Sequence, residues 1–275
     1  GARIVHCCGF DSIPSDLGVH FLQRNALEQF GHSCERIDMR VVSMKGGASG
    51  GTIASMINMV KEAVSDADLR RELKDPYSLC PPQHKFSIAQ ADVKIEYDEV
   101  AGGWIAPFIM AGINARVVHR SNALSNNSYG FAFKYEEAVL TGQGASGKRK
   151  AQAAHWGVNA LMIGLAVPPI RWLLETAILP KPGEGPSEKA QLEGMFDIVF
   201  HGSTAEGETI RCRVTGDRDP GYGSTAKMLS QAAACLAKDV PKAVPGGFWT
   251  PATILGDKLI KRLEAHAGLT FEILT

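Results

Sequence analysis

The spacing of apolar residues along the chain predicts both strands and amphipathic helices. Apolar and polar residues alternate in several stretches, a period of two that is typical of strands burying one face. These stretches are 35–45, 93–98, 195–201 and 209–215. Apolar residues recur at helical intervals after Pro14, after Gly51 and after Thr250, and again within residues 228–236, so four helices are expected there. The last two strands are close enough to form a hairpin. The pattern favours a mostly antiparallel sheet with helices, an α+β fold class.

The first strand leads directly into a helix through a polar loop. The β-branched run that begins at Ile4 stops at Gly9. Asp11 or Ser12 can cap the following helix, Pro14 suits its first turn, and Gly31 can end it. In α/β folds, ligands bind beyond the carboxyl ends of strands, where such loops lie. We therefore expect the Gly9–Asp16 loop to border a ligand.

A second turn of this kind is rich in glycine. The sequence Gly46-Gly-Ala-Ser-Gly-Gly51-Thr52 stands between a predicted strand and a predicted helix. A helix that begins in such a turn leaves free N–H groups, which can hold an anion or an oxygen atom of a ligand.

Charge and cysteine content narrow the class of protein. Lys+Arg and Asp+Glu both number 29, so no excess of positive charge favours nucleic acid as a partner. The six cysteines form no CxxC pair, which favours buried thiols in a reducing, cytoplasmic compartment. No pair of histidines, cysteines or carboxylates has the spacing of metal ligands, so we expect no metal site.

Residues 148–174 combine positive charge with a long apolar run. Lys148-Arg-Lys150 precedes a stretch from Ala151 to Ile170 that carries no formal charge. The stretch has the length of a bilayer span, but its polar residues and a proline pair make it a poor one. Two interpretations stay open. The segment lies on a membrane or lines a lipid-accepting groove, or it is a pair of core helices.

Two sequence patterns point to other chemistry. Gly142-Gln-Gly-Ala-Ser-Gly147 fits a dinucleotide loop, but no acid follows about 20 residues later, and we interpret it as a flexible surface loop. Gly47-Ala-Ser49-Gly-Gly51 fits the nucleophile turn of a serine hydrolase, with a later histidine as the base. Too few residues precede it for the strands of that fold. A serine hydrolase using Ser49 is therefore an alternative, not the main prediction.

The first loop also carries a resemblance to a known family. Cys8-Gly-Phe-Asp-Ser-Ile-Pro-Ser-Asp-Leu-Gly18 resembles the signature loop of the saccharopine dehydrogenase-like oxidoreductases, which include the trans-acting enoyl reductases. Similar motifs recur along nearly the whole chain. They are Ala106-Pro-Phe108, Asn114, Arg120-Ser121, Tyr129-Gly130, Gly216-Asp217 and Tyr222-Gly-Ser-Thr-Ala-Lys227.

The resemblance implies a division of the chain. The family's glycine-rich nucleotide loop belongs upstream, in a Rossmann domain of about 120 residues, so we expect this chain to be a carboxyl-terminal part that is inactive alone. Residues 1–32 would be the closing strand and helix of the dinucleotide-binding domain. Residues 33–216 would form the substrate and dimerisation domain, and residues 217–275 would return to the dinucleotide domain. The α+β sheet would thus be flanked by remnants of a Rossmann-type α/β domain, and a homodimer would form through the sheet.

The resemblance further implies an NAD(P)-dependent oxidoreductase that transfers hydride to or from a C=N or C=C bond of a small or lipid-like substrate. NAD(P) would be bound mainly by the upstream domain. The residues expected to border it here are Gly9, Phe10, Asp11, Ser12 and Pro14. The residues expected to shape the substrate pocket are Gly46, Gly47, Ser49, Gly50, Gly51, Thr52, Asn114, Arg120 and Tyr129. The sequence assigns no proton donor. A non-catalytic, lipid- or membrane-associated protein with the same fold is the other alternative.

Overall fold

The computed structural model describes all residues, 1–275. The strands are β1 (Arg3–Val5), β2 (Arg36–Lys45), β3 (Glu96–Asp98), β4 (Gly103–Pro107), β5 (Lys134–Gly142), β6 (Met195–Ser203), β7 (Thr209–Gly216), β8 (Gly247–Trp249) and β9 (Leu269–Leu274). The helices are α1 (Ile13–Phe30), α2 (Gly50–Ser65), α3 (Ala67–Glu72), α4 (Ala111–Leu124), α5 (Gly144–Ala166), α6 (Pro168–Ala177), α7 (Glu188–Glu193), α8 (Gly223–Lys238), α9 (Pro251–Ile254) and α10 (Gly256–His266).

Seven strands form one twisted sheet in the order β3-β4-β5-β2-β6-β7-β9. Only β2 and β5 run parallel, and every other neighbouring pair is antiparallel. The α+β class and the mostly antiparallel sheet are therefore confirmed. The predicted hairpin is β6 and β7, which pair from Phe196–Gly216 to Ser203–Thr209.

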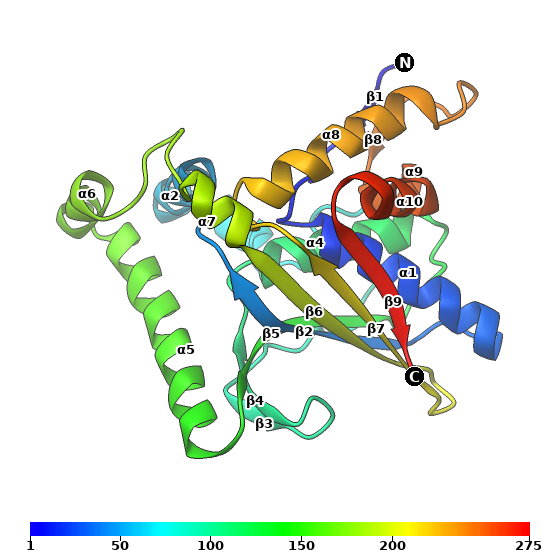
Figure 1. Cartoon of the computed structure of the whole chain (residues 1–275), viewed down its shortest axis with the longest axis horizontal. Helices are drawn as coiled ribbons and strands as arrows, with labels where there is room; N and C mark the ends of the chain where they lie inside the picture. Colours follow the sequence, from blue (N-terminus) through cyan, green and yellow to red (C-terminus); the bar gives the residue numbers. More distant parts are fainter.

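Helices α1, α4 and α10 pack on one face of this sheet, and Figure 1 shows them together on that side. Gly18 of α1 lies so close to the ring of Phe200 on β6 that an added Cβ would come within 2.4 Å of it. One cluster of 36 buried residues extends from Phe10 to Phe271. The segments 1–32, 33–216 and 217–275 thus all contribute to a single core.

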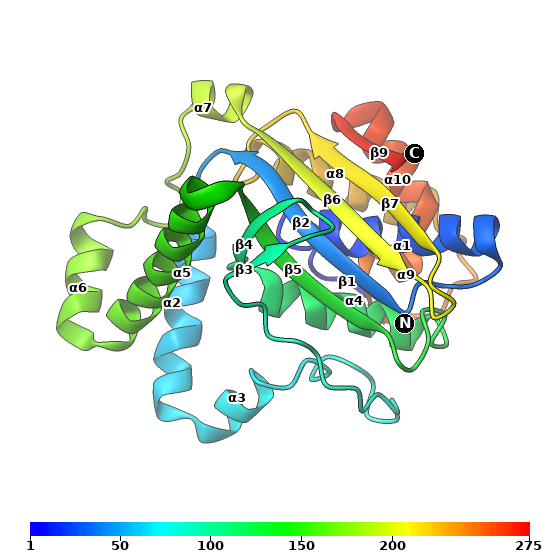
Figure 2. The ribbon, with the colours of Figure 1, turned by 90° about the horizontal axis from the view of Figure 1, so that it is seen from below.

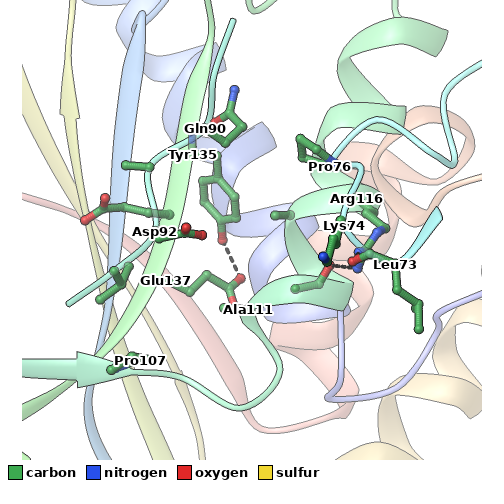
Figure 3. Close-up of a pocket in the computed structure, with 15 residues that line it drawn as sticks. Leu73, Lys74, Pro76, Gln90, Asp92, Pro107, Ala111, Arg116, Tyr135 and Glu137 are labelled. Atoms are coloured by element: carbon green, nitrogen blue, oxygen red, sulfur yellow. Dashed lines mark hydrogen bonds between the residues drawn. The ribbon is translucent and has the colours of Figure 1, made fainter. Parts of the chain in front are cut away.

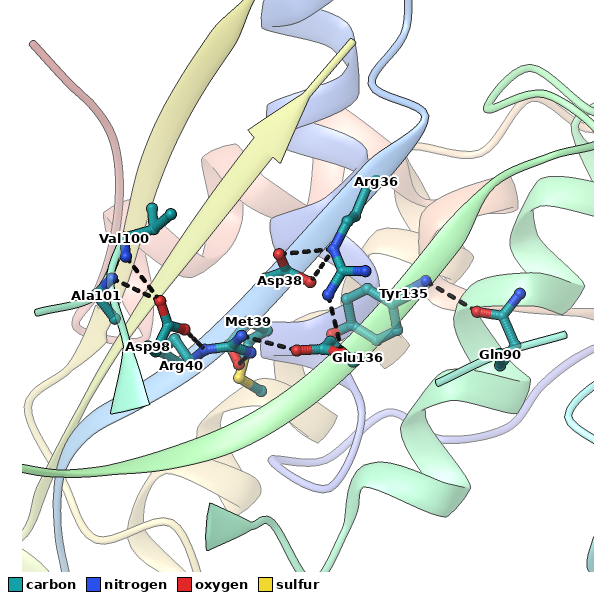
Figure 4. A network of polar contacts seen from close by, with 10 residues as sticks. All are labelled: Arg36, Asp38, Met39, Arg40, Gln90, Asp98, Val100, Ala101, Tyr135 and Glu136. Atoms are coloured by element: carbon teal, nitrogen blue, oxygen red, sulfur yellow. Dashed lines mark hydrogen bonds and ion pairs between the residues drawn. The ribbon is translucent and has the colours of Figure 1, made fainter. Parts of the chain in front are cut away.

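Figure 2 shows the opposite face of the sheet, with α1 and α4 behind it. This face carries charged side chains. Arg40 of β2 is nearly buried and bonds to Asp98 at 2.6 Å and to Glu136 at 2.7 Å. Arg36 pairs with the same Glu136 at 3.0 Å, and Figure 4 shows the resulting network. This explains why residues 35–45 alternate. Ile37, Met39 and Val41 face the helix-covered core, while Arg36 and Arg40 lie on the opposite face of the sheet, where acidic residues pair with them.

A second, separate sheet contains only β1 and β8, which run parallel. Ile4 is 38% exposed and Phe248 is 59% exposed on these strands. Parallel strands usually occur in sheets that are covered on both faces, so this small sheet is unusually open.

The segment 142–147 is not the surface loop that we expected from the sequence. Strand β5 ends at Gly142 and α5 begins at Gly144. Gly147 is buried in the first turn of α5, where an added Cβ would lie 2.1 Å from the carbonyl oxygen of Gly142. Gly147 is therefore needed for the close packing of the helix on the end of the strand, whereas Gly142 and Gly144 provide positive φ angles of 101° and 60° in the turn between them.

No single helix combines the length and apolar character needed to cross a membrane. Helices α5 and α6 meet that test only as a pair bent by 108°.

Candidate functional site

A cavity of about 270 Å³ lies where four connecting segments meet. These segments are the loop after β1, the glycine-rich turn after β2, residues 108–110 after β4, and residues 220–225 at the start of α8. Phe10 and Asp11 of the expected cofactor group line it together with Gly46, Gly47, Ser49 and Thr52 of the expected substrate group. The structure thus brings the two predicted groups to one place.

Hydrogen bonds fix the first loop against the start of α8. The N–H of Phe10 donates to the hydroxyl of Thr225 at 3.0 Å, and that hydroxyl donates to the carbonyl of Pro220 at 2.8 Å. Gly9 packs tightly here, because an added Cβ would lie 3.0 Å from the methyl group of Thr225. Cys7, two residues after the end of β1, has a φ of 61°, a conformation that non-glycine residues rarely adopt and that is found at functional turns.

Free backbone donors line one side of the cavity. The N–H groups of Gly47, Ala48 and Ser49 form no hydrogen bond, whereas that of Gly50 donates to the carbonyl of Glu184 at 2.8 Å. The Ser49 hydroxyl caps α2 by accepting from the N–H of Thr52 at 3.1 Å. Free N–H groups at the positive end of a helix favour a partly negative oxygen of a ligand.

The other walls are apolar and contain one carboxyl group. Met44, Ile53, Met56 and Phe108 are among the apolar residues, and Asp11 is the only acidic residue on the wall. Asp11 is exposed as a whole residue, but partial desolvation of its carboxyl raises the pKa of Asp11 above its ordinary value. Asp11 can therefore hold a proton at a higher pH than a free aspartate.

A serine hydrolase at this cavity would lack its base. No histidine lines the cavity, and the Ser49 hydroxyl is used as a helix cap, 3.0 Å from the hydroxyl of Thr52. The alternative that uses Ser49 as a nucleophile has no support in this geometry.

A chain of buried polar side chains connects the first loop to the sheet. Ser12 donates to the Oδ1 atom of Asn114 at 3.1 Å, and Asn114 Nδ2 donates to Glu137 at 3.0 Å. The hydroxyl of Tyr135 donates to the other oxygen of Glu137 at 2.7 Å, the contact drawn in Figure 3. Asn114, which we expected in the substrate pocket, thus lies beneath the loop and not on the cavity wall.

Glu137 is the residue that sequence reasoning missed. It is 1% exposed, and burial raises its pKa to about 7, although hydrogen bonds from Tyr135, Ser15 and Asn114 act in the opposite direction. The signal was present in the alternation of the strand. Phe133 and Tyr135 face the core, and Glu137 is the next residue on the same side.

Asp16 forms a second buried polar centre behind the loop. Its carboxylate accepts hydrogen bonds from the Ser121 hydroxyl and, at 2.8 Å, from the N–H of Ala252. Burial raises its pKa to about 7, against the effect of these two donors. Because Asp16 belongs to α1, Ser121 to α4 and Ala252 to α9, this carboxylate holds three helices together.

A larger cavity, of about 630 Å³, has Pro107 and Ala111 on its wall (Figure 3), whereas residues 108–110 between them line the smaller cavity. Tyr135 and Glu137 lie on its wall beside Asp92, Lys74 and Arg116. The guanidinium of Arg116 donates to the backbone carbonyls of the neighbouring loop and is therefore already occupied. Glu137 thus has the Ser12 loop on one side and an open cavity on the other.

Five other expected site residues do not line the smaller cavity. Arg120 donates to the carbonyl oxygens of Leu79 and, at 2.7 Å, Phe248, and so connects two loops. Tyr129 is buried in the core with its ring against Phe133. Pro14 is buried in the first turn of α1, and Gly50 packs against the Lys181 carbonyl. Gly51 lies beside it in the first turn of α2.

Three side chains at the surface have potential metal-ligand atoms within 4.8 Å of one another: His32, Glu206 and Glu208. Residue spacing does not reveal this group, because His32 follows α1 while the two glutamates lie in the β6–β7 turn.

Comparison with known proteins gives relatives that match along the whole chain. A Mycobacterium tuberculosis protein that carries the provisional name of a trans-acting enoyl reductase is 40% identical over 287 residues, covering 99% of this chain and 67% of the relative. The proteins named trans-acting enoyl reductase from M. tuberculosis and Mycobacterium ulcerans are each 36% identical, covering 96% of this chain and 65% of their own length. The chain thus spans about two thirds of the length of these relatives.

No protein-family model matches the chain, and no solved structure matches it. The wider resemblance to saccharopine dehydrogenase-like oxidoreductases stays a prediction. The identity to the named relatives is high enough, and extends over enough of each protein, to establish relationship. The chain belongs to the family of the trans-acting enoyl reductases.

Proposed function

We propose that this protein reduces a C=C bond conjugated to a carbonyl group in a small or lipid-like acyl substrate, with NAD(P)H as the reductant. One observation carries the proposal. The 270 Å³ cavity joins both predicted loops and combines apolar walls, free N–H groups and a single carboxyl group. The names of the relatives support an oxidoreductase of the enoyl reductase type.

The residues of the first loop fit a nicotinamide better than a charged phosphate. Phe10 and Asp11 reach the cavity, and no lysine or arginine lines it. A nicotinamide ring is flat and largely apolar, whereas the phosphates of the cofactor need the glycine-rich loop of a separate domain. The open β1–β8 sheet supports this arrangement, because the crossover helices of a larger parallel sheet would cover Ile4 and Phe248.

The chain's own groups would act on the substrate in three ways. The apolar walls hold the acyl chain, and the free N–H groups of residues 47–49 bind the carbonyl oxygen. When bound, reduced nicotinamide supplies the hydride that is added at the β-carbon. Negative charge then develops on the carbonyl oxygen, where the N–H groups and the positive end of α2 stabilise it.

Asp11 is the group that can complete the reaction. Reduction of the double bond requires one proton at the α-carbon, and Asp11 carries the only carboxyl on the cavity wall. Transfer of its proton forms the new C–H bond and leaves a carboxylate, which solvent protonates again. The raised pKa of Asp11 favours the protonated form that this role needs.

The experiment uses the protein at its full natural length with NADPH or NADH. Crotonyl-coenzyme A serves as the enoyl probe, its longer-chain homologues test for a lipid-like substrate, and the saturated butyryl thioester is the control. We expect loss of the reduced cofactor's absorbance only with the enoyl thioesters. An imine probe in the same assay tests the C=N bond. Oxidation of the cofactor by none of the enoyl thioesters would contradict the proposal.

A further inference from the structure

Helices α5 and α6 expose an unusual amount of apolar surface. We refer to residues 144–177 as the α5–α6 arm. Trp156 is 67% exposed, Ile163 is 64% exposed and Trp172 is 65% exposed, and Leu173 and Ile170 are exposed beside them. Figure 1 shows α5 and α6 at one edge of the molecule, away from the helices that cover the sheet. Large apolar side chains exposed along two adjoining helices mark a surface for binding.

The exposed residues of α5 form one face. Arg149, Trp156 and Ile163 are separated by seven residues each, which places them on the same side of the helix. Ala153, Gly157 and Ala160 are exposed between them. The opposite side of α5 packs inward, where Leu165 lies with Ile53 and Ile57 of α2. The arm is therefore amphipathic: its buried side packs against α2, and its exposed apolar side has no partner within the chain.

Nearly all charged side chains of the arm are positive. From Gly144 to Leu174 the chain contains Lys148, Arg149, Lys150 and Arg171 but no acidic residue, although the whole chain has a net charge of zero. Glu175, the first acid after this stretch, is paired with Lys61 of α2 at 2.7 Å. Positive charge beside exposed tryptophans suits a surface that is anionic outside and apolar beneath.

The arm is also connected to the candidate site. Helix α2 supplies Ile53 to the core of the arm and to the wall of the 270 Å³ cavity. Met56 likewise lies on the cavity wall and packs against the same cluster. A lipid-like molecule held at the arm would therefore lie next to the helix that forms one side of the cavity.

We propose that the α5–α6 arm is a membrane-binding surface that rests on an anionic lipid bilayer through Trp156, Ile163 and Trp172. The arm lies in the plane of the bilayer and does not cross it, in agreement with the 108° bend between its helices. Membrane binding stands apart from the proposed reduction, because it can be measured without substrate or cofactor.

The test measures binding of the full-length protein to vesicles of neutral phosphatidylcholine and to vesicles with 30% phosphatidylglycerol added. We expect flotation with the anionic vesicles, weaker binding at high salt, and a shift of tryptophan fluorescence to shorter wavelength. The double variant Trp156→Ser/Trp172→Ser should bind at least tenfold more weakly. Arg149→Glu/Lys150→Glu should lose the preference for anionic vesicles. Lys148 is left unchanged because it lies over the ring of Trp104, 4.9 Å from its centre.

Matched controls keep loss of binding distinct from loss of folding. Leu229→Ser removes a similarly exposed apolar residue on α8, and Lys189→Glu reverses a charge on α7; both should bind like the wild type. Absence of vesicle binding, or binding that the arm variants leave unchanged, overturns the proposal. The proposal is also overturned if the protein binds no vesicles and the tryptophan variant forms smaller oligomers than the wild type. The arm would then be a contact between two copies of the chain.

Discussion

The backbone N–H of Phe10 donates a hydrogen bond to the hydroxyl of Thr225, 3.0 Å away and 215 residues further along the chain. This bond joins the loop after β1 to the first turn of α8, and both segments line the smaller cavity. The shape of the cavity therefore depends on a contact between the two ends of the chain.

Removal of the Thr225 hydroxyl should loosen this wall. Thr225→Val keeps the shape of the side chain but leaves the N–H of Phe10 and the carbonyl of Pro220 without their partner. We expect a loss of about 1–3 kcal/mol in the free energy of unfolding, the usual effect of unpaired buried groups, together with a higher KM. Denaturant titration and steady-state kinetics measure the two effects. Thr225→Ser keeps the hydroxyl and is the control; equal losses in both variants would show that the methyl group matters instead.

Asp11→Asn tests the proposed acid. The side chain keeps its size but no longer donates an acidic proton, so turnover should fall by about 10²-fold or more, with a smaller change in KM. In the wild type the protonated form is required, so turnover should decrease as pH rises through the raised pKa of Asp11. That decrease should be absent in the variant. The control is Asp68→Asn at the surface of α3. A pH profile that Asp11→Asn leaves unchanged would remove Asp11 from the reaction.

Glu137 should make stability depend on pH. Its pKa is raised to about 7 in the folded protein, against 4.5 when free. Between these values the folded state binds more protons than the unfolded state, so stability is greatest at low pH and falls as pH rises toward 7. The difference corresponds to about 3 kcal/mol. The raised pKa of Asp16 acts in the same direction.

Glu137→Gln removes one of these titrations. Relative to the wild type, the variant should become more stable as pH rises from 5 to 8, since its side chain stays neutral throughout. Urea unfolding at several pH values measures this difference. Glu96→Gln is the matched control, because Glu96 is exposed on the edge strand β3. A stability difference between Glu137→Gln and the wild type that is constant with pH would show that Glu137 is ionised in both states.

Local patterns predicted much of the fold. The alternation in β2, β6 and β7 and the Gly31 C-cap of α1 could be read directly, because each depends on neighbouring residues alone. Strand β3 is shorter than the alternation suggested, since only Glu96–Asp98 pair with β4. Helix α4 was not predicted, because its buried Asn114, Ser121 and Asn122 interrupt the apolar pattern. Asn114 and Ser121 bind partners far away in the sequence, whereas Asn122 binds the backbone of Tyr129 and Gly130 in the loop that follows α4.

The candidate site shows the same limit. The two loops were found from the sequence because a strand, glycines and a helix cap follow one another there. The two loops line one cavity only together with the turn at residues 219–225. In this turn the Asp219 carboxylate accepts hydrogen bonds from the N–H groups of Gly221 and Gly223, each at 2.8 Å. Arg120 seemed suited to a substrate because it lies among apolar residues, but backbone carbonyls of distant loops satisfy it. No local pattern contains such contacts.

Two glycines of α5 offer a direct comparison of close packing with helix propensity. In Gly147→Ala the new methyl group would meet the carbonyl oxygen of Gly142 at 2.1 Å, so α5 must move away from the end of β5. We expect a loss of about 1–3 kcal/mol in the free energy of unfolding. In Gly157→Ala the methyl group meets nothing within 4 Å, and alanine should stabilise the helix by up to about 1 kcal/mol. Urea unfolding of the two variants measures both effects. Equal effects would mean that Gly147 is retained for some reason other than packing against β5.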